Sequence, residues 1–292
     1  MPKKNKDTTS RKAGPAGKNQ AVGRNQSDDR NQAAKKKQHV QGKPAASKSQ
    51  PNPIRILVVG GMGTGKSSFV AAATGPSCNV EIGHGPDSCT SGCKEYPTKY
   101  SVGQNQIVLI DTPGFNDPQT PNAEILKKIA SVVGGISGIL YFYRCTDTRF
   151  DGDLRVNFEI IKTMCGPEFY SRVTICSTFW NTVTGNSSQE KLYQHRTRAE
   201  NFLDDPRVFG QVMKGGAEYR EFWKDEKDPC SDILQHFLSQ RKPPNMAIIN
   251  QLKKNGKLDN TEAGRKINTE GDSSPEVPSS GAVARFFRWL GN

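Results

Sequence analysis

The sequence has 292 residues, which is enough for one or two domains with a sizeable hydrophobic core. Only 34% of the residues are hydrophobic, which predicts that part of the chain lies outside that core. The net charge is +12, and residues 1–50 alone hold 13 Lys and Arg against 3 Asp and Glu. No stretch approaches the roughly 18 consecutive apolar residues of a membrane-spanning helix, so the sequence does not indicate an integral membrane protein.

Residues 1–52 form a basic tail whose first 50 residues contain no Phe, Trp, Tyr, Leu or Ile. Such a segment cannot bury enough apolar surface to offset its ordering entropy, so we expect disorder. Two interpretations are open, an electrostatic tether to nucleic acid or anionic lipid around Lys35-Lys36-Lys37, and a solubilising tail without a fixed partner. The absence of an apolar leader and the odd number of cysteines, seven, favour a cytoplasmic location, with peripheral membrane association as an alternative.

Apolar runs and helical patterns alternate along residues 53–242. Strands are expected at residues 54–59, 96–102, 106–110, 138–143 and 173–178, with an edge strand at 217–222. Helices are expected at residues 66–73, 123–133, 154–164, 189–203 and 231–240. This alternation predicts an α/β domain whose mostly parallel sheet is covered by helices on both faces. Residues 243–281 are expected to be a linker, because residues 255–281 are rich in Gly, Pro, Ser and Glu.

An amphipathic helix is predicted for residues 282–292. Val283, Phe286, Phe287 and Leu290 fall at i, i+3, i+4 and i+7, which places them on one face. A helix this short is marginal in water and needs a surface. Three surfaces remain open: the chain's own domain, a membrane interface, and the groove of a partner protein.

The strongest motif follows the first strand. Residues 60–67, GGMGTGKS, match the phosphate-binding pattern G-x-x-x-x-G-K-[ST] between a strand and a helix. In this pattern backbone N–H groups surround phosphate oxygens, Lys66 reaches the β and γ phosphates, and Ser67 offers a hydroxyl to Mg²⁺. The predicted phosphate ligands are Gly60, Gly61, Met62, Gly63, Thr64, Gly65, Lys66, Ser67 and Ser68.

A second motif, Asp111-Thr112-Pro113-Gly114, ends an apolar strand 45 residues after Lys66. Asp111 would then lie at the carboxyl edge of the sheet and hold Mg²⁺ through water, and the Gly114 N–H would face a γ-phosphate. Between the two motifs we expect a switch loop in which Thr90 binds Mg²⁺. Ser88 and Ser91 compete for that role, and an ordinary polar loop is the alternative.

The runs GGMGTGKSSFV, SCTSGCKEY and VLIDTPGFND resemble the septin-like branch of P-loop GTPases, which includes the GIMAP proteins and the chloroplast Toc import receptors. Later blocks, such as VTICSTFWNTV, resemble G-domain proteins of mushroom-forming fungi. The resemblance covers residues 54–240 and implies a Ras-like domain that binds GTP and GDP with Mg²⁺ and often dimerises across the nucleotide face. It also implies that Lys66, Thr90 and Gly114 serve GTP hydrolysis, and that Thr178, Phe179, Trp180 and Asn181 lie at the base.

Two departures from this family pattern affect function. The family reads guanine with an Asp that accepts two hydrogen bonds, whereas Asn181 offers one acceptor and one donor. One unpaired donor costs about 1–3 kcal/mol, so we expect weakened guanine selectivity or tolerance of xanthine, with Phe179 stacking on the base. Phe115 stands where Ras-type enzymes carry a water-orienting Gln.

The sequence therefore predicts a guanine-nucleotide switch protein, a weak GTPase whose slow hydrolysis depends on a dimer or another partner. A non-catalytic nucleotide-binding scaffold with relaxed base selectivity is the alternative. An ATP-using P-loop enzyme is disfavoured by the Asp-Thr-Pro-Gly motif and the switch-like Thr90.

Overall fold

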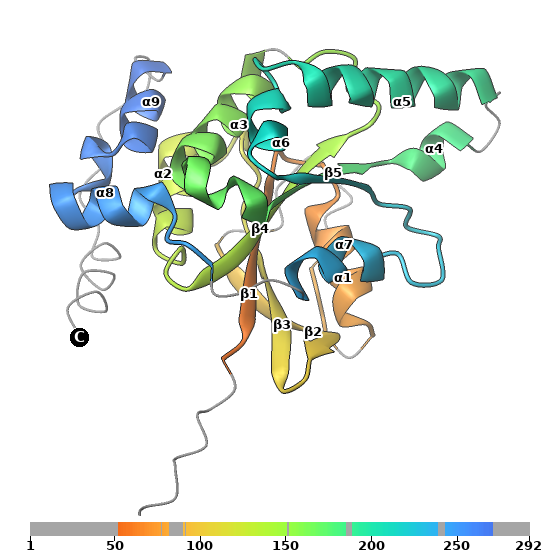
Figure 1. Cartoon of the computed structure of the whole chain (residues 1–292), viewed down its shortest axis with the longest axis horizontal. Coiled ribbons are helices and arrows are strands. Elements are labelled where there is room, and N and C mark those ends of the chain that lie inside the picture. Colours follow the sequence, from red (N-terminus) through yellow and green to blue (C-terminus); the bar gives the residue numbers. More distant parts are fainter. Residues whose placement is uncertain are drawn as a thin grey trace, which may run out of the picture. The chain divides into compact units, whose positions relative to one another are not determined.

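The computed structural model describes residues 52–76, 78–81, 90, 92–150, 152–184, 189–238 and 243–270. All of them fall in one of the chain's two compact units, Ser49–Asn292. The predicted tail, apart from Asn52, and the amphipathic helix at residues 282–292 lie outside the described residues. Figure 1 shows a central sheet with helices on both of its faces.

The sheet has six strands in the order β2-β3-β1-β4-β5-β6. Its strands are β1 (Ile54–Gly60), β2 (Lys94–Val102), β3 (Asn105–Asp111), β4 (Ile136–Arg144), β5 (Val173–Thr178) and β6 (Glu218–Glu221). β1 runs parallel to both β3 and β4, and β5 and β6 extend the parallel sheet. Only the edge strand β2 is antiparallel to its neighbour β3. This is the predicted Ras-like α/β fold, with an apolar, doubly covered centre and less buried edges.

Two hydrophobic clusters lie on opposite faces of the sheet. One face packs α1 (Lys66–Thr74) and α7 (Ser231–Leu238) against β1 and β3. The other is covered by α2 (Asn122–Ala130), α3 (Gly152–Cys165) and α6 (Gly210–Lys214), and the connecting η1 (Pro167–Arg172) contributes to the same cluster. α4 (Trp180–Thr184) and α5 (Gln189–Asp204) follow the C-terminal end of β5.

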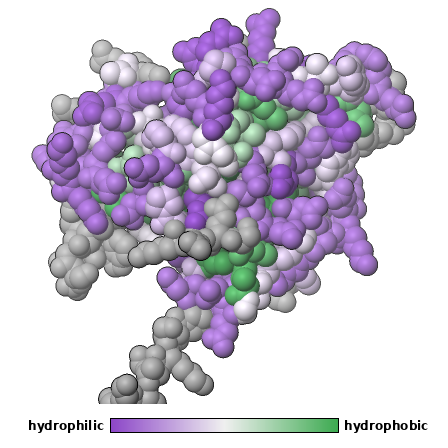
Figure 2. Space-filling model, in the orientation of Figure 1, coloured by the Kyte–Doolittle hydropathy of each residue, from purple (hydrophilic) through white to green (hydrophobic). Residues whose placement is uncertain are grey.

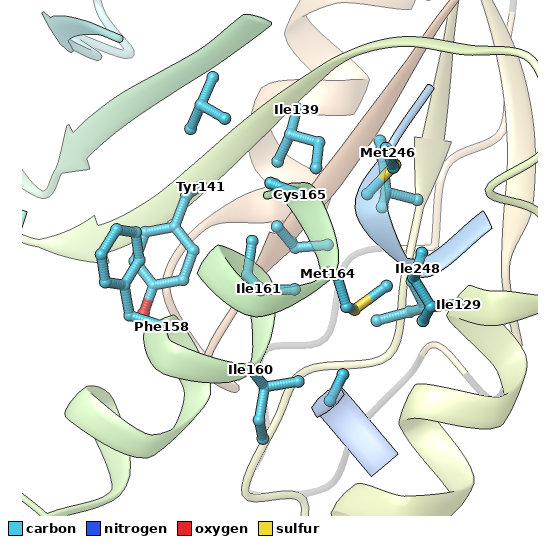
Figure 3. Packing of buried hydrophobic residues seen from close by; sticks show 14 of the residues in the cluster. Ile129, Ile139, Tyr141, Phe158, Ile160, Ile161, Met164, Cys165, Met246 and Ile248 are labelled. Atoms are coloured by element: carbon cyan, nitrogen blue, oxygen red, sulfur yellow. The ribbon is translucent and has the colours of Figure 1, made fainter. Parts of the chain in front are cut away.

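The prediction of a linker at residues 243–281 is wrong for its described part. α8 (Ala247–Asn255), η2 (Leu258–Asn260) and α9 (Glu262–Glu270) pack on α2 and α3. Figure 3 shows Met246 and Ile248 in the same cluster as Met164 of α3 and Ile129 of α2. The apolar residues of these two helices are few and are spaced for a helix face, so averaging the composition over the whole stretch concealed them.

The other predicted elements have counterparts in the structure, but η1, α4 and α6 were not predicted, and several boundaries differ. β2 begins at Lys94, inside the stretch expected to be a loop, and α2 ends at Ala130 rather than at residue 133. The edge strand β6 is shorter than predicted. These are boundary differences, which propensity and periodicity define least well.

Candidate functional site

The phosphate-binding loop joins the end of β1 to the start of α1. Gly65, the residue before α1, has φ +87°, a left-handed conformation that favours glycine. Gly60 lies so close to β4 that a Cβ on it would be 2.3 Å from the carbonyl oxygen of Phe142. The loop can therefore turn tightly and direct backbone N–H groups to one side, as an anion requires.

Lys66 lies across this loop and is almost fully buried. Its Nζ donates to the carbonyl oxygens of Gly61 at 2.8 Å and Gly60 at 3.2 Å. Burial lowers the pKa of Lys66 to about 8, and the negative charge of Asp111 opposes part of that shift. An ammonium that has lost its water gains most from a bound anion, so the position suits a phosphate.

Ser67 and Asp111 meet at the carboxyl end of the sheet. The Ser67 Oγ donates to Asp111 Oδ2 at 2.8 Å. Asp111 Oδ1 is buried and has no hydrogen-bond partner among the described residues. Burial raises the pKa of Asp111, while Lys66 and the Ser67 hydrogen bond lower it. A buried carboxylate with an unused oxygen beside a hydroxyl fits a magnesium ion or its water ligands.

The Asp111–Gly114 motif is tied directly to the phosphate-binding loop. The Thr112 Oγ1 donates to the Val58 carbonyl at 2.8 Å. The N–H of Met62 donates to the Phe115 carbonyl at 3.0 Å, and the Phe115 N–H donates to the Gly60 carbonyl at 3.2 Å. A Cβ on Gly114 would lie 2.6 Å from the Cα of Met62, so only glycine fits. The two motifs thus form one surface.

The side chain of Phe115 points away from that surface. It is fully buried in the cluster with α2 and α3. The next residue, Asn116, has φ +63°, and its N–H and side-chain oxygen bind the Asn122 side chain at the start of α2. The loop after Gly114 is therefore anchored to the core rather than presenting a polar side chain to a nucleotide.

Among the described residues, Thr90 makes no hydrogen bond with Ser67 or Asp111. Its competitors Ser88 and Ser91 lie outside the described residues. The magnesium role of Thr90 stays a prediction. Ser68 lies half-buried in the first turn of α1, beside the predicted phosphate site.

The segment after β5 forms the other end of the site. The Thr178 Oγ1 donates to the carbonyl of Thr64 at 2.9 Å and to that of Tyr143 at 3.1 Å, which ties this segment to the phosphate-binding loop. Phe179 has φ +67° and is 38% exposed, although it is a large apolar residue. Its Cε2 lies 3.9 Å from where a Cβ on Gly65 would be. An exposed ring in this place fits the predicted stacking on a base.

Trp180 does not lie at the base, in contrast to its predicted role. Its side chain is fully buried, its indole N–H donates to the Ser177 hydroxyl at 2.9 Å, and its ring stacks on Trp223 with ring centroids 5.7 Å apart. A buried indole cannot contact a ligand. The reason for the difference is that Trp180 begins α4 and faces the core, whereas Phe179 precedes it in a left-handed conformation that faces outward.

Asn181 has both of its polar atoms engaged. Its Oδ1 accepts from the N–H of Lys224 at 3.0 Å, and its Nδ2 donates to Asp225 Oδ2 at 2.7 Å. Sequence reasoning missed Asp225, which lies in the loop after β6. No motif marks it, and the only signal was that β6 would end on the same side of the sheet as β5.

No helix among the described residues is both long and apolar enough to cross a membrane. In the same part of the chain, no group of three or more His, Cys, Asp and Glu could hold a metal. A magnesium site here would therefore use one carboxylate together with hydroxyl, phosphate and water oxygens.

Comparison with known proteins agrees with this geometry. The family model of 50S ribosome-binding GTPases matches residues 55–156. GTP-binding protein A of Dictyostelium discoideum is 30% identical over 156 residues, which is 51% of this chain and 33% of the relative. The match thus spans a third of the length of that relative.

Two solved structures are similar to part of this chain. Toc33 from Arabidopsis thaliana, in complex with Mg²⁺ and GMPPNP, is 20% identical over 66% of this chain and 87% of its own, with a TM-score of 0.49. The second is a structure of the chloroplast translocon components atToc33 and psToc159, for whose GTPase activity dimerisation is important. It is 19% identical over 66% of this chain and 86% of its own, with a TM-score of 0.50. The match at residues 55–156 therefore indicates a G domain of the P-loop GTPase type in this part of the chain.

Proposed function

We propose that this G domain is a guanine-nucleotide switch of the septin-like and GIMAP-like branch, which hydrolyses GTP slowly and depends on a second copy or another partner to do so. The observation that carries the proposal is the arrangement of Lys66, Ser67 and Asp111 around one glycine-rich loop. The Lys66 ammonium is buried away from water, and the Asp111 carboxylate has one buried oxygen without a hydrogen-bond partner among the described residues. A bound polyphosphate would compensate the charge of Lys66, and a bound cation would compensate that of Asp111.

At the phosphate end, Lys66 would exchange its loop carbonyls for the oxygens of the β and γ phosphates. Ser67 and Thr90 would hold Mg²⁺ directly and Asp111 would hold it through water. When bound, the ion withdraws charge from the β and γ phosphates. As water attacks the γ-phosphate and the β–γ bond breaks, Lys66 and the Gly114 N–H would stabilise the charge on the phosphate oxygens.

At the base end, we propose that Asp225 replaces the missing acidic residue of the family motif. The Asn181 amide holds one oxygen of this carboxylate, which leaves Asp225 Oδ1 for the N1–H and amine of guanine. Phe179 would cover one face of the ring. Asn181 would then position the reading group rather than read the base itself, and part of the expected loss of guanine selectivity would be recovered.

Slow hydrolysis by a single copy is supported by Phe115. A fully buried phenyl ring cannot orient a water molecule, and in the described part of the chain no polar side chain takes its place in the anchored loop after Gly114. A second copy, docked across the nucleotide face, would supply the missing group. The relevance of dimerisation to the GTPase activity of the Toc proteins supports this part of the proposal.

A non-catalytic scaffold is the second candidate, and the same buried Phe115 favours it. The two functions differ only in turnover, because both retain the phosphate-binding loop. A scaffold would bind GTP and never release phosphate at any protein concentration.

The test combines binding and turnover on the full chain. Calorimetric titration with Mg·GDP and Mg·GTP should show one site, and Lys66→Ala should weaken binding at least about a hundredfold through loss of charge-assisted hydrogen bonds to phosphate. Phosphate release per molecule should then rise with protein concentration if a second copy completes the site. Binding without concentration-dependent release would favour the scaffold, and no binding by folded protein would refute both functions.

A further inference from the structure

A second charged pocket lies away from the nucleotide site, between α3, α6 and α9. Its volume is about 510 Å³, and its lining residues come from α3, from the turn before α6, from α6 and from α9. The molecular face that carries these helices is largely hydrophilic (Figure 2). None of the lining residues belongs to the phosphate-binding loop or to residues 178–181.

Basic side chains dominate the walls. Arg155 and Lys162 lie on one face of α3, at i and i+7, Arg207 comes from the turn before α6, and Lys266 comes from α9. Glu159, at i+4 on the same face of α3, is the single acidic lining residue. The pocket therefore collects four cations from three separate segments.

The ion pairs within the pocket leave a surplus of positive charge. Lys162 and Lys266 share Glu159, with Lys266 Nζ at 2.6 Å from Glu159 Oε2. Arg207 is paired with Asp205, which lies beside the pocket, at 2.7 Å. Arg155 is exposed and makes no ion pair with any described residue. Four cations against two carboxylates leave about two positive charges, which matches the charge of a phosphomonoester near neutral pH.

The polar groups that line the pocket are positioned so that its surplus positive charge can contact a bound anion. Lys162 Nζ also donates to Gln211 Oε1 at 3.2 Å, which fixes the ammonium at the junction of α3 and α6. Arg155 offers forked N–H donors, which suit the oxygens of a phosphate group. Arg207 contributes its positive charge and its Nη1 donors, because its Nε and Nη2 bind Asp205, and the two lysines act as point charges. A phosphate would release Lys162 and Lys266 from sharing a single carboxylate.

We propose that this pocket is a second ligand site, which binds the phosphate group of a phosphomonoester. The site is independent of the P-loop, although Leu154, next to Arg155, approaches it: Leu154 Cδ2 is 4.0 Å from where a Cβ on Gly61 would be. The same chemistry is present in a soluble phosphomonoester and in a phosphatidic acid headgroup, so the experiment must distinguish these two sources.

The probe is inorganic phosphate, titrated into the isotope-labelled full chain and followed by amide NMR shifts. The P-loop is first saturated with Mg·GDP, and a second series uses Lys66→Ala without nucleotide, so that the pocket is tested even if nucleotide binding fails. Shifts should saturate at residues of α3, α6 and α9 in both series. Arg155→Gln and Lys162→Gln should each weaken binding about tenfold, since each removes one charge-assisted contact.

Lys214→Gln is the matched control, because Lys214 is exposed on α6 and does not line the pocket. It should leave the dissociation constant unchanged. Glycerol 3-phosphate should bind where glycerol does not, and flotation with phosphatidylcholine vesicles with and without phosphatidic acid tests the lipid source. The proposal is overturned if no saturable shifts occur at these helices, or if Lys214→Gln weakens binding as much as Arg155→Gln does.

Discussion

The hydrogen bond between Asn181 and Asp225 leads us to predict an effect of Asn181→Asp on GDP binding that is opposite to the one that the sequence motif suggests. From the motif alone, Asn181→Asp restores the usual guanine-reading residue and should increase guanine selectivity. In the structure the same substitution places a second carboxylate where Asn181 Nδ2 now donates to Asp225 at 2.7 Å. We therefore expect Asn181→Asp to weaken GDP binding.

The size of the effect follows from that distance. Two unit negative charges at 2.7 Å repel each other by roughly 1.5 kcal/mol even in bulk water. The substitution also removes one hydrogen bond to a charged acceptor, while the acceptor for the Lys224 N–H is retained. Because the pair is exposed and the loop can move apart, we expect relaxation to limit the loss, and GDP affinity should fall about tenfold.

The assay is competition of GDP, XDP and IDP for the Mg²⁺-loaded protein. Glu226→Gln is the matched control for the charge that Asp225→Asn removes from the same exposed loop in the double variant. The double variant Asn181→Asp with Asp225→Asn exchanges the two groups, restores the hydrogen bond between them and should recover GDP affinity. If Asn181→Asp alone raises the preference for GDP over XDP tenfold without loss of affinity, Asp225 does not belong to the base site.

Three further predictions concern the phosphate end and the core. Because the pKa of Lys66 falls from 10.5 to about 8 on folding, the unfolded chain binds more protons between those values. The nucleotide-free protein should therefore gain up to about 3 kcal/mol of stability from pH 8 to 10.5, and denaturation curves of Lys66→Met should lack that gain. Phe115→Gln should cost about 3 kcal/mol of unfolding free energy without raising GTP turnover, because the side chain faces the core; faster phosphate release would contradict this. Ile248→Ala should lower the free energy of unfolding in urea by about 2–4 kcal/mol. An unchanged denaturation midpoint would show that residues 243–270 are a linker that does not pack on the core.

Much of the phosphate end could be predicted from the sequence because its chemistry is local. Five residues separate Gly60 from Lys66, and the backbone geometry of a strand, a tight turn and a helix places the loop in any such domain. The alternation of apolar strands and helices predicted a mostly parallel sheet, although not the order of its strands. In the structure, the contact between Gly114 and Met62 arises because both motifs end neighbouring parallel strands.

The base end could not be predicted in the same way, because it depends on contacts between segments distant in sequence. Asn181 and Asp225 are 44 residues apart, and nothing in the sequence around Asp225 indicates that it meets α4. Burial of Trp180 depends on its stacking with Trp223 from the same distant loop. The packing of α8 on α3 is similarly non-local, since the apolar face of a short helix does not reveal which surface covers it.

The two ends of the site differ in how firmly they are held, and this has a functional consequence. The phosphate-binding loop and the strand before it are held by hydrogen bonds from two segments, Thr112 and the Phe115 backbone after β3 and Thr178 at the end of β5. Asn181 lies in the short helix α4, and its partner Asp225 lies in an exposed loop after the edge strand β6. Disruption of one exposed pair leaves the buried framework intact, so base preference can change at little cost to stability or to phosphate binding. A departure from the usual guanine motif is therefore compatible with a fully retained phosphate site, and its presence at residues 178–181 is no sign that nucleotide binding has been lost.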